Sequence, residues 1–360
     1  MIANSGEYRK KNGQRGYVMM NNFIFENKTK VYFGKGGVKE YLGGLLANFG
    51  ETVMLAYGGG SIKCNGVYDE IMGILNAQGK CVVEFSGIMS NPTYAKVQDG
   101  AKLARENHVD LILAVGGGSV SDCCKVISAQ ANLNEDIWEM QYTKHTLPTK
   151  FIPLGTIVTV FGTGSEMNNG AVITHEEKKI KGALWGAQAE FAFLDPAYSL
   201  SVPMQQVISG AFDTLSHAME TYFGKPDENN LSDDTNEAAM AENGVLKIGK
   251  VTDFQAHQIE HQLGAYTNCN HGASLAVIHP VLYRHIYKSG AARFARFAQN
   301  VWASHPRAVT GKPPPVSTRW PRSLRKSVCR PALQSLAFPP TPTSAPWRIL
   351  PTSPLAAARS

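Results

Sequence analysis

Four histidines and one aspartate stand at spacings that suit a bound metal ion. Asp213 and His217 are four residues apart, as are His257 and His261, and side chains at i and i+4 share one face of a helix. His271 follows beyond a polar bend, where the chain can turn back toward that face. Neutral imidazoles and a carboxylate are good ligands for a divalent transition metal. Any one of these histidines alone is better explained as an ordinary core or surface residue, but the combination predicts a metal site.

A strand that passes through glycines into a helix forms a second chemical motif. Residues 110–115 are an apolar run typical of a buried strand, and a helical pattern covers residues 120–131. Glycines let the backbone approach a phosphate, and the helix N-terminus offers unpaired N–H groups. The position after a β-α-β run favours a dinucleotide pyrophosphate, although a tight turn without a ligand explains the glycines equally well. The residues concerned are Gly116, Gly117, Gly118 and Ser119, with Asp122 in the first helical turn as either a dipole-compensating acid or a cofactor contact.

A second glycine turn, after the apolar residues 52–57, bears on the choice of nicotinamide cofactor. An NAD-binding fold often carries an acid at such a position for the ribose 2′-hydroxyl, and none is present here. Ser61 and Lys63 are available instead as donors to a 2′-phosphate. The turn, which contains Gly58, Gly59 and Ser61, therefore favours NADP over NAD, although a plain turn explains it equally well.

The elements that must hold these residues alternate between apolar runs and helical patterns up to about residue 200, which indicates an α/β layer fold. Beyond Pro203 the strand patterns give way to helical ones, so we expect helices to carry the aspartate and the histidines. The expected strands cover residues 52–57, 80–85 and 110–115, and the expected helices cover residues 66–75, 94–107 and 120–131.

Composition divides the chain into four segments. Residues 1–19 are expected to be a disordered leader, which leaves Met1 and Met20 as alternative starts. Residues 20–200 form the expected dinucleotide-binding domain, and residues 201–302 the helical domain, whose pattern is interrupted near residue 240. Residues 303–360 hold 12 of the 19 prolines and no acid, so we expect a disordered tail. We interpret the interruption and the tail as an internal deletion and a frameshift.

The net charge of +6 does not indicate a nucleic-acid-binding surface. Nine of the 35 lysines and arginines lie in residues 303–360, which leaves 26 against 29 acids in the rest of the chain. No apolar run reaches the roughly 20 residues of a membrane span. The six cysteines show no C-x-x-C spacing, which argues for a reducing compartment. We expect a cytoplasmic protein with a small-molecule substrate and without nucleic-acid or membrane partners.

In combination these residues resemble the iron-containing (group III) alcohol dehydrogenase family, and within it the NADP-dependent butanol dehydrogenase-like branch. The resemblance runs from about residue 21 to residue 302. It depends on the segments 56–63, 115–122, 162–166 and 194–196, on Asp213-x-x-x-His217, and on His257, His261 and His271.

The resemblance implies an N-terminal Rossmann-like dinucleotide-binding domain followed by an all-helical metal-binding domain, the dehydroquinate synthase-like architecture. It further implies a homodimer, NADP or NAD, and Fe²⁺ or Zn²⁺ in the cleft between the domains. Carried over by motif, the implied metal ligands are Asp213, His217, His257 and His271, and His261 is implied as a proton relay near the nicotinamide. Gly116 to Ser119 match the pyrophosphate loop, and the positions matching further cofactor contacts are Thr159, Thr163 and Lys181.

The implied activity is hydride transfer between NAD(P)H and a short-chain alcohol or aldehyde. One carboxylate with three neutral imidazoles would leave a divalent metal site net positive, which suits a developing alkoxide. Alternatives remain from other classes: an impaired or inactive truncated member that retains only nucleotide binding, and a glycerol or polyol dehydrogenase. His257-x-x-Glu260-His261 also matches a metalloprotease pattern in which Glu260 is the general base.

Overall fold

The computed structural model describes residues 7–9, 15–17, 26–226, 250–251 and 254–302. Its contacts group the chain into two units, each described by itself. The α/β unit comprises Asn27–Gly210 and His261–Asn270. The helical unit comprises the described residues of Met1–Glu26, Ala211–Glu260 and His271–Ser335. The break near residue 240 and the proline-rich tail lie outside the described residues, so both interpretations stay predictions.

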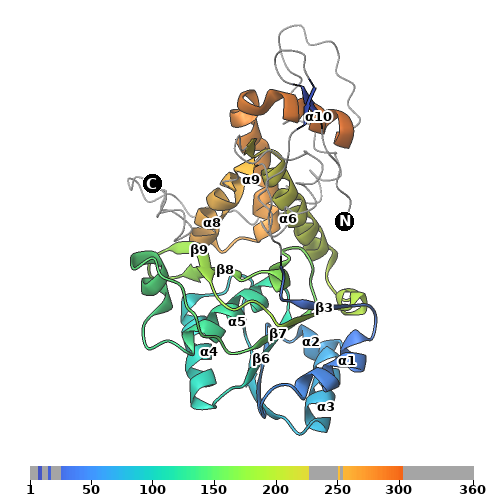
Figure 1. Ribbon diagram of the computed structural model, residues 1–360, viewed down its shortest axis with the longest axis vertical. Helices are drawn as coiled ribbons and strands as arrows, with labels where there is room; N and C mark the ends of the chain where they lie inside the picture. The colour runs from blue at the N-terminus through green and yellow to red at the C-terminus, as the bar shows by residue number, and fades with distance from the viewer. Residues whose placement is uncertain (1–6, 10–14, 18–25, 227–249, 252–253, 303–360) are drawn as a thin grey trace. The chain divides into compact units, whose positions relative to one another are not determined.

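Strands and helices alternate through the α/β unit (Figure 1). The strands are β3 (Lys30–Phe33), β4 (Thr52–Tyr57), β5 (Cys81–Phe85), β6 (Leu111–Gly116), β7 (Leu154–Val158), β8 (Gly170–His175), β9 (Ile180–Trp185) and β10 (Phe191–Leu194). The helices are α1 (Gly37–Leu46), α2 (Ser61–Cys64), α3 (Val67–Ala77), α4 (Tyr94–Glu106) and α5 (Gly118–Gln130), with short helical turns at Glu139–Thr143, Ser165–Met167 and Pro196–Ser199.

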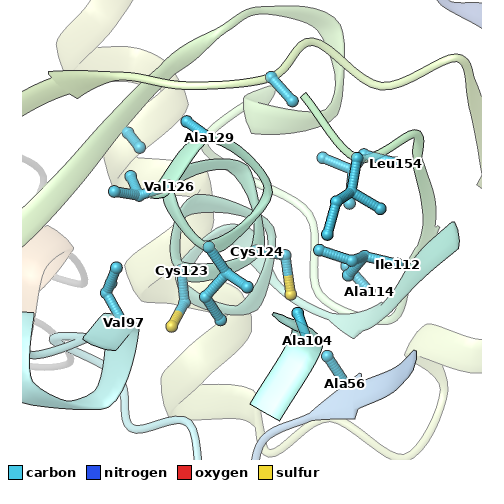
Figure 2. Packing of buried hydrophobic residues seen from close by; sticks show 14 of the residues in the cluster. Ala56, Val97, Ala104, Ile112, Ala114, Cys123, Cys124, Val126, Ala129 and Leu154 are labelled. Carbon is cyan, nitrogen blue, oxygen red and sulfur yellow. The ribbon is translucent and has the colours of Figure 1, made fainter. Parts of the chain in front are cut away.

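Six strands form one parallel sheet in the order β3-β10-β7-β6-β4-β5. Successive side chains of a strand point to opposite faces, and both faces of β4 and β6 are apolar. On one face Leu55 and Leu113 belong to a core with α1 and α3. On the other, Ala56 and Ala114 belong to a core with α4 and α5, whose side chains are shown in Figure 2. The helices therefore cover both faces, as a parallel sheet requires.

The sheet places the two glycine turns side by side. From β4 the chain passes to β5 on one side, whereas β6 lies on the other side of β4, so the strand order reverses between β4 and β6. Tyr57 and Val115, the residues before the two turns, are directly paired. Ligands of open α/β sheets bind beyond the carboxyl ends of the strands at such a reversal. The topology thus brings both predicted cofactor-binding turns to one point.

The α/β architecture and a helical second part are confirmed, and the apolar runs predicted β4, β5 and β6 to within a residue or two. The antiparallel hairpin of β8 and β9 was not distinguished in the sequence, because it lies among glycine-rich turns. Residues 7–9 and 15–17 pair as short strands β1 (Glu7–Arg9) and β2 (Arg15–Tyr17) within the expected leader. The rest of that leader lies outside the described residues, so its disorder stays a prediction.

The remaining elements are α6 (Met204–Tyr222), β11 (Lys225–Pro226), β12 (Lys250–Val251), α8 (Gln255–Thr267), α9 (His271–Ile286), a 3-10 turn at Tyr287–Gly290 and α10 (Ala291–Trp302). In the helical unit Phe223, just after α6, stacks on Phe294 of α10 with ring centroids 4.1 Å apart and contacts Tyr283 of α9. Ser216 of α6 bonds His279 of α9 across 2.6 Å. These contacts fix α6 against α9 and α10. Among the helices that the structure describes, none is both long and apolar enough to cross a membrane.

A fully buried lysine fastens a loop of the α/β unit to α5. The Nζ atom of Lys125 donates to Ser165 Oγ at 2.8 Å and to Gly170 O at 2.7 Å. Asp122, one turn earlier, accepts from Ser165 Oγ at 2.5 Å and from the Val172 N–H at 2.8 Å. A buried charge costs free energy unless hydrogen bonds replace its hydration. The lysine thus ties the loop at residues 162–168 and strand β8 to the start of α5.

We expect Lys125→Met to lower the free energy of unfolding by about 3–5 kcal/mol at pH 7, because it leaves Asp122 and the loop acceptors without their cation. Urea unfolding followed by circular dichroism measures this. Lys102→Met on α4, where the lysine side chain is 70% exposed, is the matched control. If Lys125→Met loses no more unfolding free energy than the control, Lys125 does not hold the loop as described.

The same comparison has a pH dependence. Burial lowers the pKa of Lys125 to about 8, against about 10.4 in an unfolded chain. Between these values the unfolded state binds more protons, so stability rises with pH. The wild type is stabilised in this way as the pH rises, and Lys125→Met is not. The difference between their free energies of unfolding therefore widens by about 2 kcal/mol from pH 7 to pH 9.5.

Candidate functional site

Three helices bring the predicted metal ligands together within the helical unit. Asp213 and His217 lie one turn apart on α6, and His257 lies in the first turn of α8. His271 follows the bend after α8, as the sequence predicts, and is the first residue of α9. The i, i+4 pattern of α6 predicted its pair correctly. No spacing rule predicted that the helix after this bend would begin at His271.

The three imidazoles all face one carboxylate oxygen. The Nε2 atoms of His217, His257 and His271 lie 3.6, 3.5 and 3.3 Å from Oδ1 of Asp213. Ligand atoms of Asp213, His217 and His257 all lie within 4.8 Å of one another. Ligands about 2.1 Å from a tetrahedral metal stand roughly 3.4 Å apart. The Asp213–histidine separations are too long for good hydrogen bonds and fit a shared cation.

The environment of Asp213 supports the same conclusion. The residue is 3% exposed, and its buried Oδ1 has no hydrogen-bond partner within the described part of the chain. Burial alone would raise the pKa of this carboxyl, but the facing His271, His257 and His217 outweigh burial and hold the pKa well below its usual value. An ionised, buried carboxylate oxygen without a donor fits a cation ligand.

The histidines differ in their proton affinity because they differ in their partners. Burial, reinforced by the neighbouring His257, lowers the pKa of His217 to about 4, so this ring is neutral at physiological pH. Burial also opposes the protonation of His257, but the carboxylates of Asp213 and Glu220 outweigh it and raise the pKa. A divalent cation at this position would replace the protons that the rings otherwise share with the carboxylates.

Two glutamates lie behind two of the histidines. The sequence did not predict either of them as a partner of the metal ligands. Oε2 of Glu220 on α6 forms a very short hydrogen bond with Nδ1 of His257. Oε2 of Glu260 on α8 lies 2.5 Å from Nδ1 of His271. Glu220 is seven residues after Asp213, two helical turns along the same face, and this spacing was the available signal. Nothing in the sequence linked Glu260 to His271 across the bend.

The position of Glu260 also bears on the metalloprotease pattern. Its side chain is 0% exposed and bonded to a histidine outside the pattern. A general base of that class must reach a water and a substrate. The described residues therefore do not favour this alternative. His261, the predicted proton relay, lies on α8 one turn after His257 and is 8% exposed.

The predicted pyrophosphate site lies at the start of α5. The helix begins at Gly118, its N-cap Gly117 is extended, and no side chain caps the terminal N–H groups. These donors, with the helix dipole, suit an anion. A Cβ on Gly118 would lie 2.3 Å from Oγ1 of Thr163, so only glycine lets the predicted contact residue approach. The N–H of Thr159 donates to Gly116 O at 2.9 Å, which places Thr159 beside the same turn.

Other predicted cofactor residues have different surroundings. Both carboxylate oxygens of Asp122 accept hydrogen bonds from the protein, so its geometry supports fastening the loop, and a direct cofactor contact stays a prediction. Lys181 is buried on β9. Gly58 lies against the α5 side of the sheet, where its Cβ would be 3.1 Å from Ile88 O and 3.9 Å from Val120. A Cβ on Gly59 would meet open space, and Ser61 opens α2.

Lys63, the predicted donor to a 2′-phosphate, already has an acidic neighbour. Its Nζ lies 3.4 Å from Oε2 of Glu84 and 4.3 Å from the ring centre of Tyr68. The hydroxyls of Tyr57 and Tyr68 both donate to Glu84 at 2.5 Å and lower the pKa of its carboxyl. This cluster at the ends of β4 and β5 holds the ammonium group of Lys63 next to the second glycine turn.

Known proteins resemble this chain in sequence and in fold. The family model for iron-containing alcohol dehydrogenases matches residues 28–196. The chain is 36% identical to a probable NADH-dependent butanol dehydrogenase 1 of Bacillus subtilis, over 79% of this chain and 81% of that protein. It is 34% identical to the NADPH-dependent aldehyde reductase YqhD of Escherichia coli, over 79% and 81%.

A solved structure extends the likeness to the fold. The NADH-dependent butanol dehydrogenase A of Thermotoga maritima superimposes with a TM-score of 0.72 at 30% identity, covering 88% of this chain and 85% of that one. One family relationship thus covers most of the chain in both sequence and fold. The chain belongs to the iron-containing alcohol dehydrogenase family, whose members combine a nicotinamide cofactor with a metal ion.

Proposed function

We propose that Asp213, His217, His257 and His271 hold a divalent cation and that the chain interconverts short-chain aldehydes and alcohols with NAD(P)H. The observation that carries the proposal is the convergence of three Nε2 atoms on the one oxygen Asp213 Oδ1. Butanol and aldehydes are named for the relatives, which supports butanal as the first substrate to test. Neither the comparisons nor the described residues favour the truncated-inactive, polyol or metalloprotease alternatives.

In the proposed reaction the metal supplies Lewis acidity at the carbonyl oxygen and the nicotinamide supplies the hydride. The chain's own residues bind and orient these groups. The N-terminal amides of α5 and the turn at Gly116–Ser119 bind the pyrophosphate, and Thr159 and Thr163 flank it. His261 is proposed to carry the proton to the developing alkoxide.

The metal proposed for this site is Fe²⁺ or Zn²⁺. One carboxylate oxygen and three imidazole nitrogens also accept Co²⁺ or Ni²⁺, because affinity for such a donor set follows the general order of first-row metals. The choice in the cell is then set by metal supply. The cysteine pattern supports a cytoplasmic location, which stays a prediction.

We expect His271→Ala to weaken Zn²⁺ binding by more than about 100-fold, because even losing the hydrogen-bond partner of a ligand typically costs 10–100-fold. Chelator competition on metal-depleted protein measures the affinity. Oxidation of NADPH by butanal after anaerobic loading with Fe²⁺ or Zn²⁺ measures activity, which should fall with the metal. His285→Ala, an exposed histidine on the same helix, is the control and should match the wild type. Equal affinity and turnover for His271→Ala and the control would contradict the proposed ligand set.

We further propose NADP as the preferred cofactor, supported by the turn without an acid and by Lys63 beside it. Lys63→Ala should lower the ratio of kcat/KM for NADPH over NADH about five- to tenfold, because it removes a charge-assisted hydrogen bond to the 2′-phosphate. Steady-state kinetics with both cofactors measure this ratio, with Lys102→Ala as control. An unchanged ratio, or a wild-type preference for NADH, would leave Lys63 without this role.

A homodimer is the proposed assembly. It is supported by β3, an edge strand of the described sheet, on which Phe33 is 77% and Val31 39% exposed. Phe33→Asp should shift the sedimentation coefficient toward that of a monomer, because a charge opposes the burial of this edge. Leu147→Asp, at a residue 44% exposed elsewhere in the α/β unit, is the control. A wild-type monomer at micromolar concentration would contradict the proposal.

A further inference from the structure

Two of the proposed histidine ligands are each held from behind by a buried glutamate. Glu220 bonds Nδ1 of His257, and Glu260 bonds Nδ1 of His271. We infer that Glu220 and Glu260 are positioning residues of the metal site, which fix the two imidazoles so that Nε2 faces Asp213 before any ion binds. The inference rests on the proposed metal site and deepens it, because it identifies residues that set how tightly and through which atoms the ion is held.

The direction of the two hydrogen bonds determines which ring nitrogen faces Asp213. A carboxylate can only accept, so each Nδ1 must carry the proton that it donates. The other ring nitrogen, Nε2, then keeps the lone pair of a neutral imidazole, and it is Nε2 that lies 3.5 Å (His257) or 3.3 Å (His271) from Asp213 Oδ1. Such carboxylate–histidine pairs orient ligand rings and raise their basicity.

Both glutamates are held in place by their surroundings. Glu220 is 8% exposed, and it also accepts the N–H groups of Ala256 at 2.6 Å and His257 at 3.3 Å. These are donors in the first turn of α8, which no carbonyl inside the helix can satisfy. Glu220 therefore caps the helix and orients the ring that this helix carries, so backbone and side chain of His257 are fixed by one carboxyl group.

Glu260 holds its histidine in a different way. It is 0% exposed, sits on α8 three residues after His257, and reaches His271 at the start of α9. The bond joins residues 11 apart and closes over the bend between the helices. Helix α8 thus positions two of the proposed ligands. It carries His257 itself, and it holds His271 through the hydrogen bond of Glu260.

The remaining histidine provides an internal contrast. His217 Nδ1 is buried, and within the described part of the chain it has no hydrogen-bond partner. Its orientation depends on its place on α6 and on packing against the rings of His257 and Phe254, at centroid distances of 4.4 and 5.6 Å. Two ligands are therefore braced by carboxylates and one is not.

The glutamates also change the charge of the site. Asp213, Glu220 and Glu260 place three carboxylates around three neutral imidazoles, so a divalent ion leaves a formal charge of −1. The net positive charge expected from the sequence counted Asp213 alone, and the two glutamates lower that count. The negative charge of the two glutamates, which are hydrogen-bonded to the ligand histidines, strengthens the binding of the cation and moderates its Lewis acidity.

The decisive experiment compares Glu260→Gln with the wild type and with Glu106→Gln, whose glutamate side chain is 59% exposed on α4. Zn²⁺ affinity is measured by chelator competition on metal-depleted protein, and geometry by the d–d absorption of Co²⁺-loaded protein. We expect Glu260→Gln to bind Zn²⁺ about 10–100-fold more weakly and to alter the Co²⁺ spectrum, whereas Glu106→Gln matches the wild type. Wild-type affinity and spectrum in Glu260→Gln would overturn the inference.

Two further measurements separate this inference from its foundation. If His271→Ala loses the metal while Glu260→Gln keeps it, the metal site stands and the positioning role fails; if both keep it, the metal site itself fails. Nitrogen NMR of Zn²⁺-loaded wild type labelled with ¹⁵N-histidine needs no variant to fold. It should show Nε2 coordination with slowly exchanging Nδ1–H protons at His257 and His271 only. Coordination of either ring through Nδ1 would overturn the inference.

Discussion

The helical unit depends on one electrostatic constraint, the burial of the Asp213 carboxylate against three imidazoles. Taking an anion out of water is costly unless positive charge or donors replace the lost hydration. Here one oxygen of that carboxylate is buried without a hydrogen-bond donor among the described residues, which supports the proposed cation at this position. The start of α9, the first turn of α8 and one face of α6 carry the other proposed ligands of that cation.

The proposed task of the α/β unit is complementary, namely to bind the pyrophosphate of a cofactor with backbone N–H groups. Its solution is backbone geometry: a helix start without a side-chain cap, glycines where a Cβ would collide, and a strand reversal that brings two such turns together. The buried Lys125 contributes from inside, since it holds the loop that carries Thr163 in register with α5. Lys125 is thus proposed to support the cofactor site through the loop, without contacting the cofactor itself.

Local patterns predicted the parts of this protein that local physics determines. Alternating apolar runs indicated the strands, and the i, i+4 spacing placed Asp213 and His217 on one face of α6. Interactions between distant residues were less accessible. The bond of Glu260 to His271 crosses a bend whose geometry depends on Asn268 in the left-handed region, and Glu220 meets His257 over 37 residues. A carboxylate that orients a ligand has no spacing rule of its own, so only the fold shows it.

Among the proposed histidine ligands, His217 is the one whose Nδ1 has no hydrogen-bond acceptor within the described residues. A ring held only by packing can swing by small rotations about its side-chain bonds, whereas the rings of His257 and His271 must first break a buried hydrogen bond. Escape and entry of the ion are therefore expected to proceed by opening at α6, with the other ligands still in place. The lifetime of the loaded enzyme in a metal-poor cell would then be decided by the mobility of this single side chain.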